Sequence, residues 1–206
     1  MRTTPRAYHH GDLGRALLDA AQAIVAESGV DAVTMSAVAK RSGVSSGAPY
    51  RHFKDRTELL QALSERAQEN LAERTLAAIA DAPTPLEGFR RSGVAYVRFA
   101  IDEPALFTVL SRGEFTVRDS DGPRNPADVR FAAALGELLS RGDPRAPLDP
   151  SDPVIQELAA RCMMHGLAHF VVGGMLDLVG ASKQQGERIA EALTRSLGPP
   201  AMVEGD

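Results

Sequence analysis

Tryptophan is missing from this 206-residue sequence, and cysteine occurs only once, at Cys162. A single cysteine has no partner for an internal disulfide, so the sequence excludes a small fold held together by disulfides and is typical of a reducing compartment. The amino terminus has no long apolar stretch of the kind that forms a secretory signal. We therefore expect a cytoplasmic protein.

Long hydrophobic runs are also absent. The longest apolar stretches, such as Val171-Val172 and Met175-Leu176, are interrupted by glycines and by Asp177, well short of the roughly 20 residues that span a bilayer. Hydrophobic residues nevertheless make up 44% of the chain and charged residues 24%, close to the globular average. The composition predicts a folded protein without a membrane span.

The charge is unevenly distributed along the chain. A net charge of -4 argues against a protein that coats nucleic acid along its whole length. Residues 1–57, however, carry 8 Lys and Arg against 5 Asp and Glu, whereas residues 58–206 carry 15 against 22. Only the first segment is suited to binding a polyanion.

Apolar residues recur with helical spacing, and no strand-like alternation accompanies them, so the predicted fold class is all-α. One helix, with apolar residues from Leu13 to Ile24, ends at Gly29, and a short second helix begins at an N-cap Thr34 and ends at Gly43. A third short helix, capped by Ser45 or Ser46, runs towards Phe53. The remaining runs predict helices near 55–82, 86–101, 104–112, 126–140, 152–179 and 183–197.

The second and third predicted helices have the spacing of a helix-turn-helix. This motif needs a small residue inside the corner and a glycine at the turn, which Ala39 and Gly43 supply. Small residues at the amino end of the third helix allow close approach to base edges, and polar or cationic residues behind them suit phosphates. The small residues are Ser45, Ser46, Gly47 and Ala48, and the polar ones are Tyr50, His52, Lys54 and Arg56.

A purely structural interpretation of the same segment is that Gly43 only ends a helix and that Tyr50 and Phe53 are core aromatics. The stretches Thr34–Ala39, Gly43–Ser45 and Tyr50–Leu60, however, resemble the DNA-binding domain of the TetR family of bacterial repressors. The resemblance covers about residues 8–62.

A second resemblance concerns the carboxy-terminal part. Residues Tyr8–Leu13 and the pair His165-Gly166 resemble the TetR subgroup whose carboxy-terminal domain is named for a Trp-His-Gly signature. Because the chain has no tryptophan, only the His-Gly part of that signature is present.

The family resemblance implies roles for individual residues. Positions that usually contact phosphates are occupied by Thr34, Ser36, Tyr50, His52 and Arg56. Positions that face bases are occupied by Ser46, Gly47 and Ala48. Because these three offer few hydrogen-bonding groups, base readout is expected to rely on Ser45, on Arg51 or on DNA shape.

We expect residues 1–57 to form the DNA-binding domain and residues 58–206 a helical-bundle domain for effector binding and dimerisation. A two-fold dimer reads two half-sites about one helical turn apart, and the helices near 152–179 and 183–197 are the expected interface. The expected function is that of a repressor released from a palindromic operator by a small apolar effector. The pocket is expected among Phe89, Val97, Ile101, Phe107, Leu110, Phe131, Leu135, Met164, His165 and Phe170.

Metal binding and catalysis are not expected. Adjacent histidines such as His9 and His10 point in different directions on a helix. His165 and His169 share a helix face but lack an intervening Glu, which favours a pocket or interface role. The alternatives are a small metal-dependent enzyme that uses these two histidines with Asp177, and a helical adaptor that binds only protein. No cofactor is expected.

Overall fold

The computed structural model of the protein describes residues 10–115, 126–141, 143 and 146–196. Within these ranges all regular elements are α-helices or short 3-10 helices, which confirms the all-α prediction. No described helix is long and apolar enough to cross a membrane. Tyr8 and His9 of the predicted subgroup motif lie outside the described residues.

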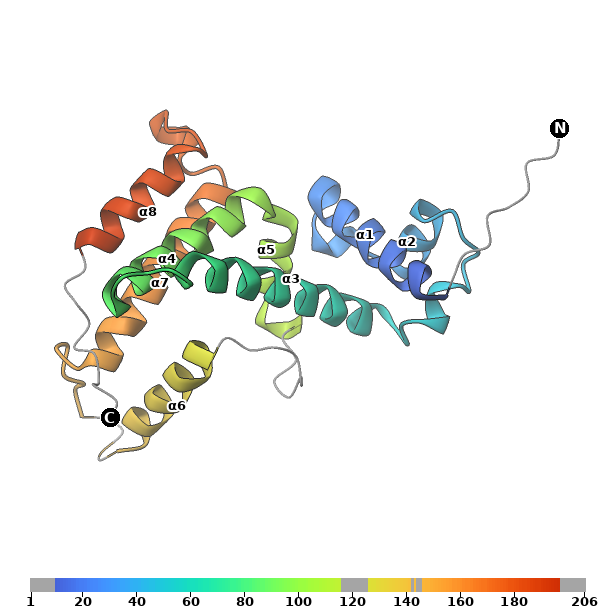
Figure 1. Cartoon of the computed structure of the whole chain (residues 1–206). Helices are drawn as coiled ribbons and strands as arrows, with labels where there is room; N and C mark the ends of the chain where they lie inside the picture. The colour runs from blue at the N-terminus through green and yellow to red at the C-terminus, as the bar shows by residue number, and fades with distance from the viewer. Residues whose placement is uncertain (1–9, 116–125, 142, 144–145, 197–206) are drawn as a thin grey trace. The chain divides into compact units, whose positions relative to one another are not determined.

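The first of two compact units contains α1 (His10–Ser28), α2 (Met35–Arg41), the first half of α3 (Arg56–Ile79) and α5 (Pro104–Leu110) (Figure 1). Both α2 and α5 contact α1. Apolar side chains of this unit are removed from water, which is the main source of its stability. The buried residues include Leu17, Val33, Val38, Leu63, Phe107 and Val109.

The boundary between the units differs from the predicted division at residue 57. The first unit extends to Gln68, so the division falls within α3, and it also contains the segment that begins at Pro104. The reason is that Phe107 and Val109 of α5 are buried in the unit to which α1 belongs. A segment that the sequence assigned to the effector domain therefore packs with the helix-turn-helix.

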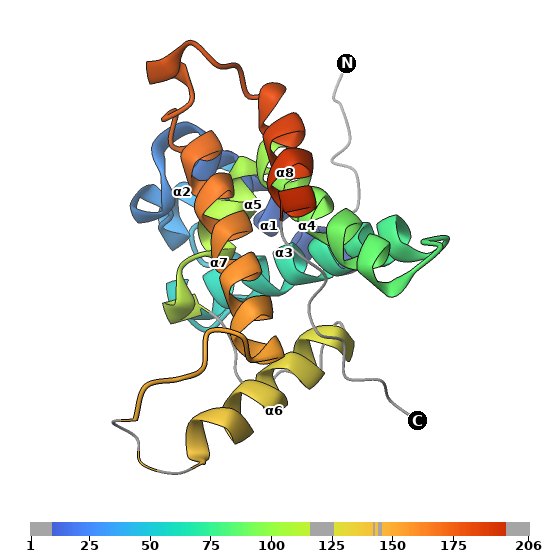
Figure 2. The same ribbon diagram turned by 90° about the vertical axis from the view of Figure 1, so that its left-hand side faces the viewer.

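The second unit is organised around α4 (Pro85–Asp102). This helix contacts both α7 (Pro153–Val172) and α8 (Gln185–Ser196), and α6 (Pro126–Ser140) lies beside α7 (Figure 2). Thr84 begins α4 by accepting a hydrogen bond from the Glu87 amide at 3.1 Å. The observed ends of α4, α5, α6 and α8 agree with the predicted helices to within about two residues.

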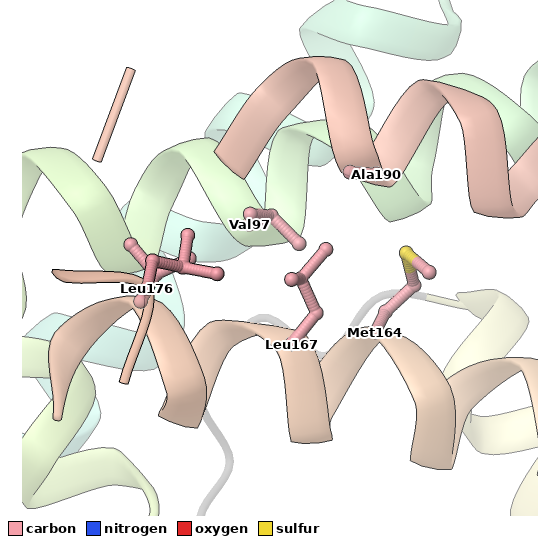
Figure 3. Close-up of a cluster of buried hydrophobic side chains, with 6 residues drawn as sticks. Val97, Met164, Leu167, Leu176 and Ala190 are labelled. Carbon is pink, nitrogen blue, oxygen red and sulfur yellow. The ribbon is translucent and has the colours of Figure 1, made fainter. Parts of the chain in front are cut away.

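An apolar cluster holds α4, α7 and α8 together. Figure 3 shows its side chains converging from the three helices and from the segment after α7. Gly186 at the start of α8 permits this approach, because a Cβ atom there would lie 2.9 Å from a methyl group of Val171. The cluster comprises Val97, Met164, Leu167, Val171, Leu176 and Ala190.

The predicted helix over 152–179 is too long. The α7 helix ends at Val172, and a short 3-10 helix, η4 (Asp177–Val179), follows. Gly174 between them has a φ of 73°, in the left-handed region that favours glycine and cannot continue an α-helix. This break turns Leu176 back into the apolar cluster, where it is buried.

Replacing Leu167 by Ala is expected to destabilise the protein by about 2–5 kcal/mol, because a buried leucine leaves a cavity as well as losing its transfer free energy. Leu139→Ala on α6 is the matched control, since Leu167 is 7% exposed and Leu139 is 56% exposed. The control is expected to change stability by less than about 0.5 kcal/mol. Urea unfolding followed by circular dichroism measures both, and equal effects would contradict this description of the core.

Candidate nucleic-acid interface

The first part of the helix-turn-helix is built by local hydrogen bonds. Thr34 begins α2 because its Oγ1 accepts a hydrogen bond from the Ala37 amide at 3.1 Å, as predicted from the sequence. Val38 and Ala39 are buried on the inner side of this helix. Gly43 follows with a φ of 69°, so it supplies the left-handed turn that the motif requires.

The predicted third helix is shorter than expected. Residues 46–48 form a turn, and only η2 (Pro49–Arg51), a single 3-10 turn, is regular. Pro49 has no amide hydrogen to donate to the Ser45 carbonyl, which instead accepts from the Ala48 amide at 2.9 Å. The segment therefore forms turns and one 3-10 turn, and it lacks the continuous hydrogen bonds of an α-helix.

This segment is anchored by apolar residues and exposes polar ones. Pro49 and Phe53 are buried, whereas Tyr50 between them is 58% exposed. The purely structural interpretation is therefore right for Phe53 and wrong for Tyr50. Ser45, Ser46 and Gly47 are exposed at the amino end of the segment, and Ala48 is half-buried.

The residues predicted to contact DNA through polar or cationic side chains differ in their exposure to solvent. Thr34, Ser36, Arg51 and Lys54 are exposed. His52 is half-buried and packs close to α1, where a Cβ atom on Gly14 would lie 3.5 Å from its Nδ1. Arg56 is the exception, because internal hydrogen bonds engage its guanidinium group.

Arg56 connects the start of α3 to the segment before α2. Its Nε donates to the Val33 carbonyl at 2.7 Å, and its Nη2 donates to the Val30 carbonyl at 3.0 Å. Asp55 begins α3 by accepting a hydrogen bond from the Glu58 amide at 2.9 Å. The side chain predicted from the family to bind phosphate therefore has a structural role that the sequence did not indicate.

Ion pairs on this unit hold two carboxylates in the charged state. Arg41 donates two hydrogen bonds of 2.6 Å to Glu27 and thereby lowers the pKa of that carboxyl group. Arg112 donates to Asp31 at 3.0 Å and lowers the pKa of Asp31 in the same way. Both carboxylates are negative near neutral pH, so Arg41 and Arg112 are largely neutralised by their partners.

The residues predicted to line an effector pocket belong to both units, and some of them are buried whereas others are exposed. Phe107 and Leu110 belong to α5 of the first unit, and Val97 and Met164 belong to the core of the second. His165 and Phe170 are exposed on α7. Which of these residues are buried in a core depends on side-chain packing, which the periodicity of the sequence does not reveal.

The second unit has an open cavity of about 680 Å³ elsewhere, between the end of α3, α4 and α8. None of the ten predicted residues lines it. Its walls combine small apolar side chains, including Ala78 and Ala95, with charged ones. The charged residues are Arg74, Glu87, Arg90, Arg91, Arg98, Glu191 and Arg195.

Four of the five arginines that line this cavity form ion pairs with carboxylates of the same unit, and Arg90 instead donates to the Thr194 carbonyl. Arg74 pairs with Asp102 at 2.6 Å, and Arg98 pairs with Glu187 through hydrogen bonds of 2.7 and 3.0 Å. The hydrogen bond from Arg98 leaves the guanidinium with a raised pKa. Such pairing makes the cavity far less positive than its arginine content suggests.

The first unit carries a helix-turn-helix whose second half, residues 45–53, is partly exposed; we call these residues the recognition segment. The fold is therefore that of a helix-turn-helix protein. The sequence model of the family "Bacterial regulatory proteins, tetR family" matches residues 17–63 of this chain. The model of the tetracyclin repressor-like C-terminal domain matches residues 89–197, more than half of the chain. The chain belongs to the TetR family, and the second match is consistent with the subgroup indicated by His165-Gly166.

Two curated transcriptional regulators are similar to this chain over about half of its length. The chain is 37% identical over 101 residues to the HTH-type transcriptional repressor BepR of Brucella suis, covering 47% of this chain and 48% of that protein. It is 36% identical over 97 residues to the HTH-type transcriptional regulator BetI of Rhizobium meliloti, covering 47% of each. The chain thus matches about half the length of these relatives.

Solved structures match over nearly the whole chain. A protein of unknown function from Rhodococcus sp. RHA1 has a TM-score of 0.61 and 28% identity, covering 93% of this chain and 98% of that one. The TetR family transcriptional regulator PfmR from Thermus thermophilus has a TM-score of 0.56 and 19% identity, covering 90% and 98%. At 19% identity, the match to PfmR shows only that the two chains share a fold.

Replacing Arg56 by Gln is expected to lower the free energy of unfolding by about 1–2 kcal/mol, because two hydrogen bonds from a charged donor to backbone carbonyls are lost. Arg51→Gln is the matched control, since Arg51 is exposed and lies in the same segment. The control is expected to leave stability within about 0.5 kcal/mol. Thermal and urea unfolding compare the two, and an unaltered stability of R56Q would rule out the structural role.

Proposed function

We propose that the protein is a homodimeric, ligand-responsive repressor that binds a palindromic operator in bacterial DNA and therefore acts in the cytoplasm. Membership of the TetR family and the assignment of BepR as a transcriptional repressor support this proposal. The comparisons give no support to the metal-dependent enzyme considered from the sequence.

The exposed recognition segment carries the proposal. Ser45, Ser46 and Gly47 have small side chains and are exposed, so a base edge can approach the backbone closely. Tyr50 is also exposed, whereas Pro49 and Phe53 are buried and hold the backbone of the segment in the core. We assign base readout to Ser45, Ser46, Gly47, Ala48 and Arg51, and phosphate contact to Thr34, Ser36, Tyr50, His52 and Lys54. Arg56 retains a phosphate role only through the part of its guanidinium group that Val30 and Val33 leave available.

We propose that α7 and α8 form the dimer interface. Large apolar side chains are exposed at the carboxyl end of α7 and in η4, where a monomer would leave them in water. Leu178, for example, is 79% exposed. A two-fold axis near this face would cover the same patch on both copies. The exposed residues are Phe170, Met175, Leu178 and Val179.

Within the described residues, two covalent connections between the units are available to transmit effector binding. The α3 helix passes from one unit to the other at Gln68, and α4 leads directly into α5 at the Glu103-Pro104 junction. Because α5 packs on α1, displacement of α4 by an effector acts on the unit that holds the recognition segment. A typical coupling of about 1–3 kcal/mol would lower operator affinity roughly 5–150-fold. Residues 1–57 then contact DNA, and the effector and dimer surfaces lie within 58–206.

Selection from a random duplex pool by the purified full-length protein tests operator binding. We expect enrichment of a palindrome whose half-sites lie about one helical turn, roughly 34–36 Å, apart. On the selected duplex, Lys54→Gln is expected to reduce the slope of log affinity against log salt by about 1, because one phosphate contact is lost. Binding isotherms at several salt concentrations measure this slope.

Ser46→Ala is the matched comparison, because it changes a residue assigned to bases and keeps the charge. This variant is expected to alter sequence preference and to leave the salt slope unchanged. If K54Q and S46A change preference and salt slope alike, the assignment of their roles is wrong. If no duplex is enriched by protein that has been unfolded and refolded to remove a bound ligand, operator binding itself is wrong.

Replacing Leu178 by Asp is expected to shift the protein from dimer to monomer in sedimentation experiments, because a charge in an apolar interface loses its hydration. Leu139→Asp on α6 is the control, since Leu139 is also exposed but lies away from the proposed interface residues in the sequence. The control is expected to remain dimeric. A dimer that survives L178D and dissociates in L139D would place the interface elsewhere.

A further inference from the structure

Two histidines on α7 lie in direct contact outside the helix-turn-helix. The Nε2 atoms of His165 and His169 are 3.2 Å apart, and the ring planes meet at 80°. The spacing of four residues places both rings on one face of the helix. Both residues are exposed, so a small solute reaches them from water.

A tyrosine from a neighbouring helix orients one of the rings. The hydroxyl of Tyr96 on α4 lies 2.7 Å from Nδ1 of His165. When Nδ1–H donates to the tyrosine oxygen, Nε2 of His165 carries a lone pair directed towards His169. Metal-binding histidines are commonly held in this way, with one ring nitrogen hydrogen-bonded and the other directed at the ion.

The distance between the two Nε2 atoms suits chelation. In a tetrahedral zinc site with Zn–N bonds of about 2.0–2.1 Å, two nitrogen ligands lie about 3.3–3.4 Å apart. The observed 3.2 Å requires little movement to accept an ion.

We propose that His165 and His169 chelate one divalent transition-metal ion that favours imidazole ligands, such as Zn²⁺, Ni²⁺ or Cu²⁺. Tyr96 is a positioning residue that acts through His165. The sequence pattern predicted no metal here because the helix lacks an intervening Glu, but that absence argues against a catalytic site and not against binding. The site is independent of the proposed operator binding.

The described residues supply only part of the coordination sphere. Among the described residues no group of three or more His, Cys, Asp or Glu side chains is placed to hold a metal ion. Water therefore completes the sphere in a single chain, or the same two histidines of a second copy complete it if the dimer forms through α7. Two imidazoles and open positions predict a reversible site and not a buried structural zinc.

Titration of the metal-free full-length protein with Zn²⁺ in a calorimeter tests the proposal. We expect H165A and H169A each to lose at least about tenfold in affinity, because a single imidazole remains. Y96F keeps both ligands and is expected to weaken binding by about 10–100-fold through loss of the orienting hydrogen bond. Circular dichroism establishes that each variant keeps its helical content.

The matched control is H9A/H10A, which removes the other histidine pair of the chain and is expected to bind Zn²⁺ as the unaltered protein does. The visible absorption of bound Co²⁺ reports coordination geometry and is expected to change in Y96F, which a purely structural role of Tyr96 would not cause. Equal Zn²⁺ affinity of H165A and the unaltered protein would overturn the proposal. So would loss of binding in H9A/H10A.

Operator binding by the same samples separates the two proposals. Intact operator binding without histidine-dependent Zn²⁺ binding would overturn the metal site alone. Zn²⁺ binding that depends on both histidines in a protein that binds no duplex would leave the metal site standing and overturn the proposed function.

Discussion

Burial of the apolar side of α5 against α1 determines how this chain is divided. Phe107 and Val109 are withdrawn from water in the first unit, although they follow α4 of the second unit directly in the sequence. The nearby ion pair between Arg112 and Asp31 is exposed and contributes little by comparison. The consequence is a chain that passes between its units three times, first within α3, then at Pro104 and again after Asp121. The first two of these connections underlie the proposed coupling between effector and operator.

The recognition segment depends on one proline and one arginine. Pro49 is buried and removes an amide donor, so the segment forms a single 3-10 turn that leaves Tyr50 exposed. Arg56 holds the carbonyl groups of Val30 and Val33 and so positions the start of α3. A residue that the family pattern assigns to DNA is thus needed first to form the scaffold. Because Pro49 and Arg56 hold the backbone, the small exposed residues Ser45, Ser46 and Gly47 are available to face DNA.

The α4 helix serves two surfaces at once. Val97 faces the cluster shared with α7 and α8, whereas Tyr96, its neighbour in the sequence, reaches the His165 ring. Consecutive residues on a helix point about 100° apart, so one helix can contribute to a core and to an exposed group of side chains. The cavity on another side of α4 is lined by arginines such as Arg74, whose carboxylate partners offset much of their charge.

Local features of the structure were determined by the sequence alone: the all-α class, the cap at Thr34 and the turn at Gly43. These depend on hydrogen bonds and dihedral angles within a few residues, which residue type and spacing specify. Only the tertiary structure decided that α5 joins the first unit, that Arg56 binds backbone carbonyls, and that predicted pocket residues such as Val97 are core. Those outcomes depend on contacts between residues far apart in the chain, and apolar periodicity records that a side chain is buried but not which partner buries it.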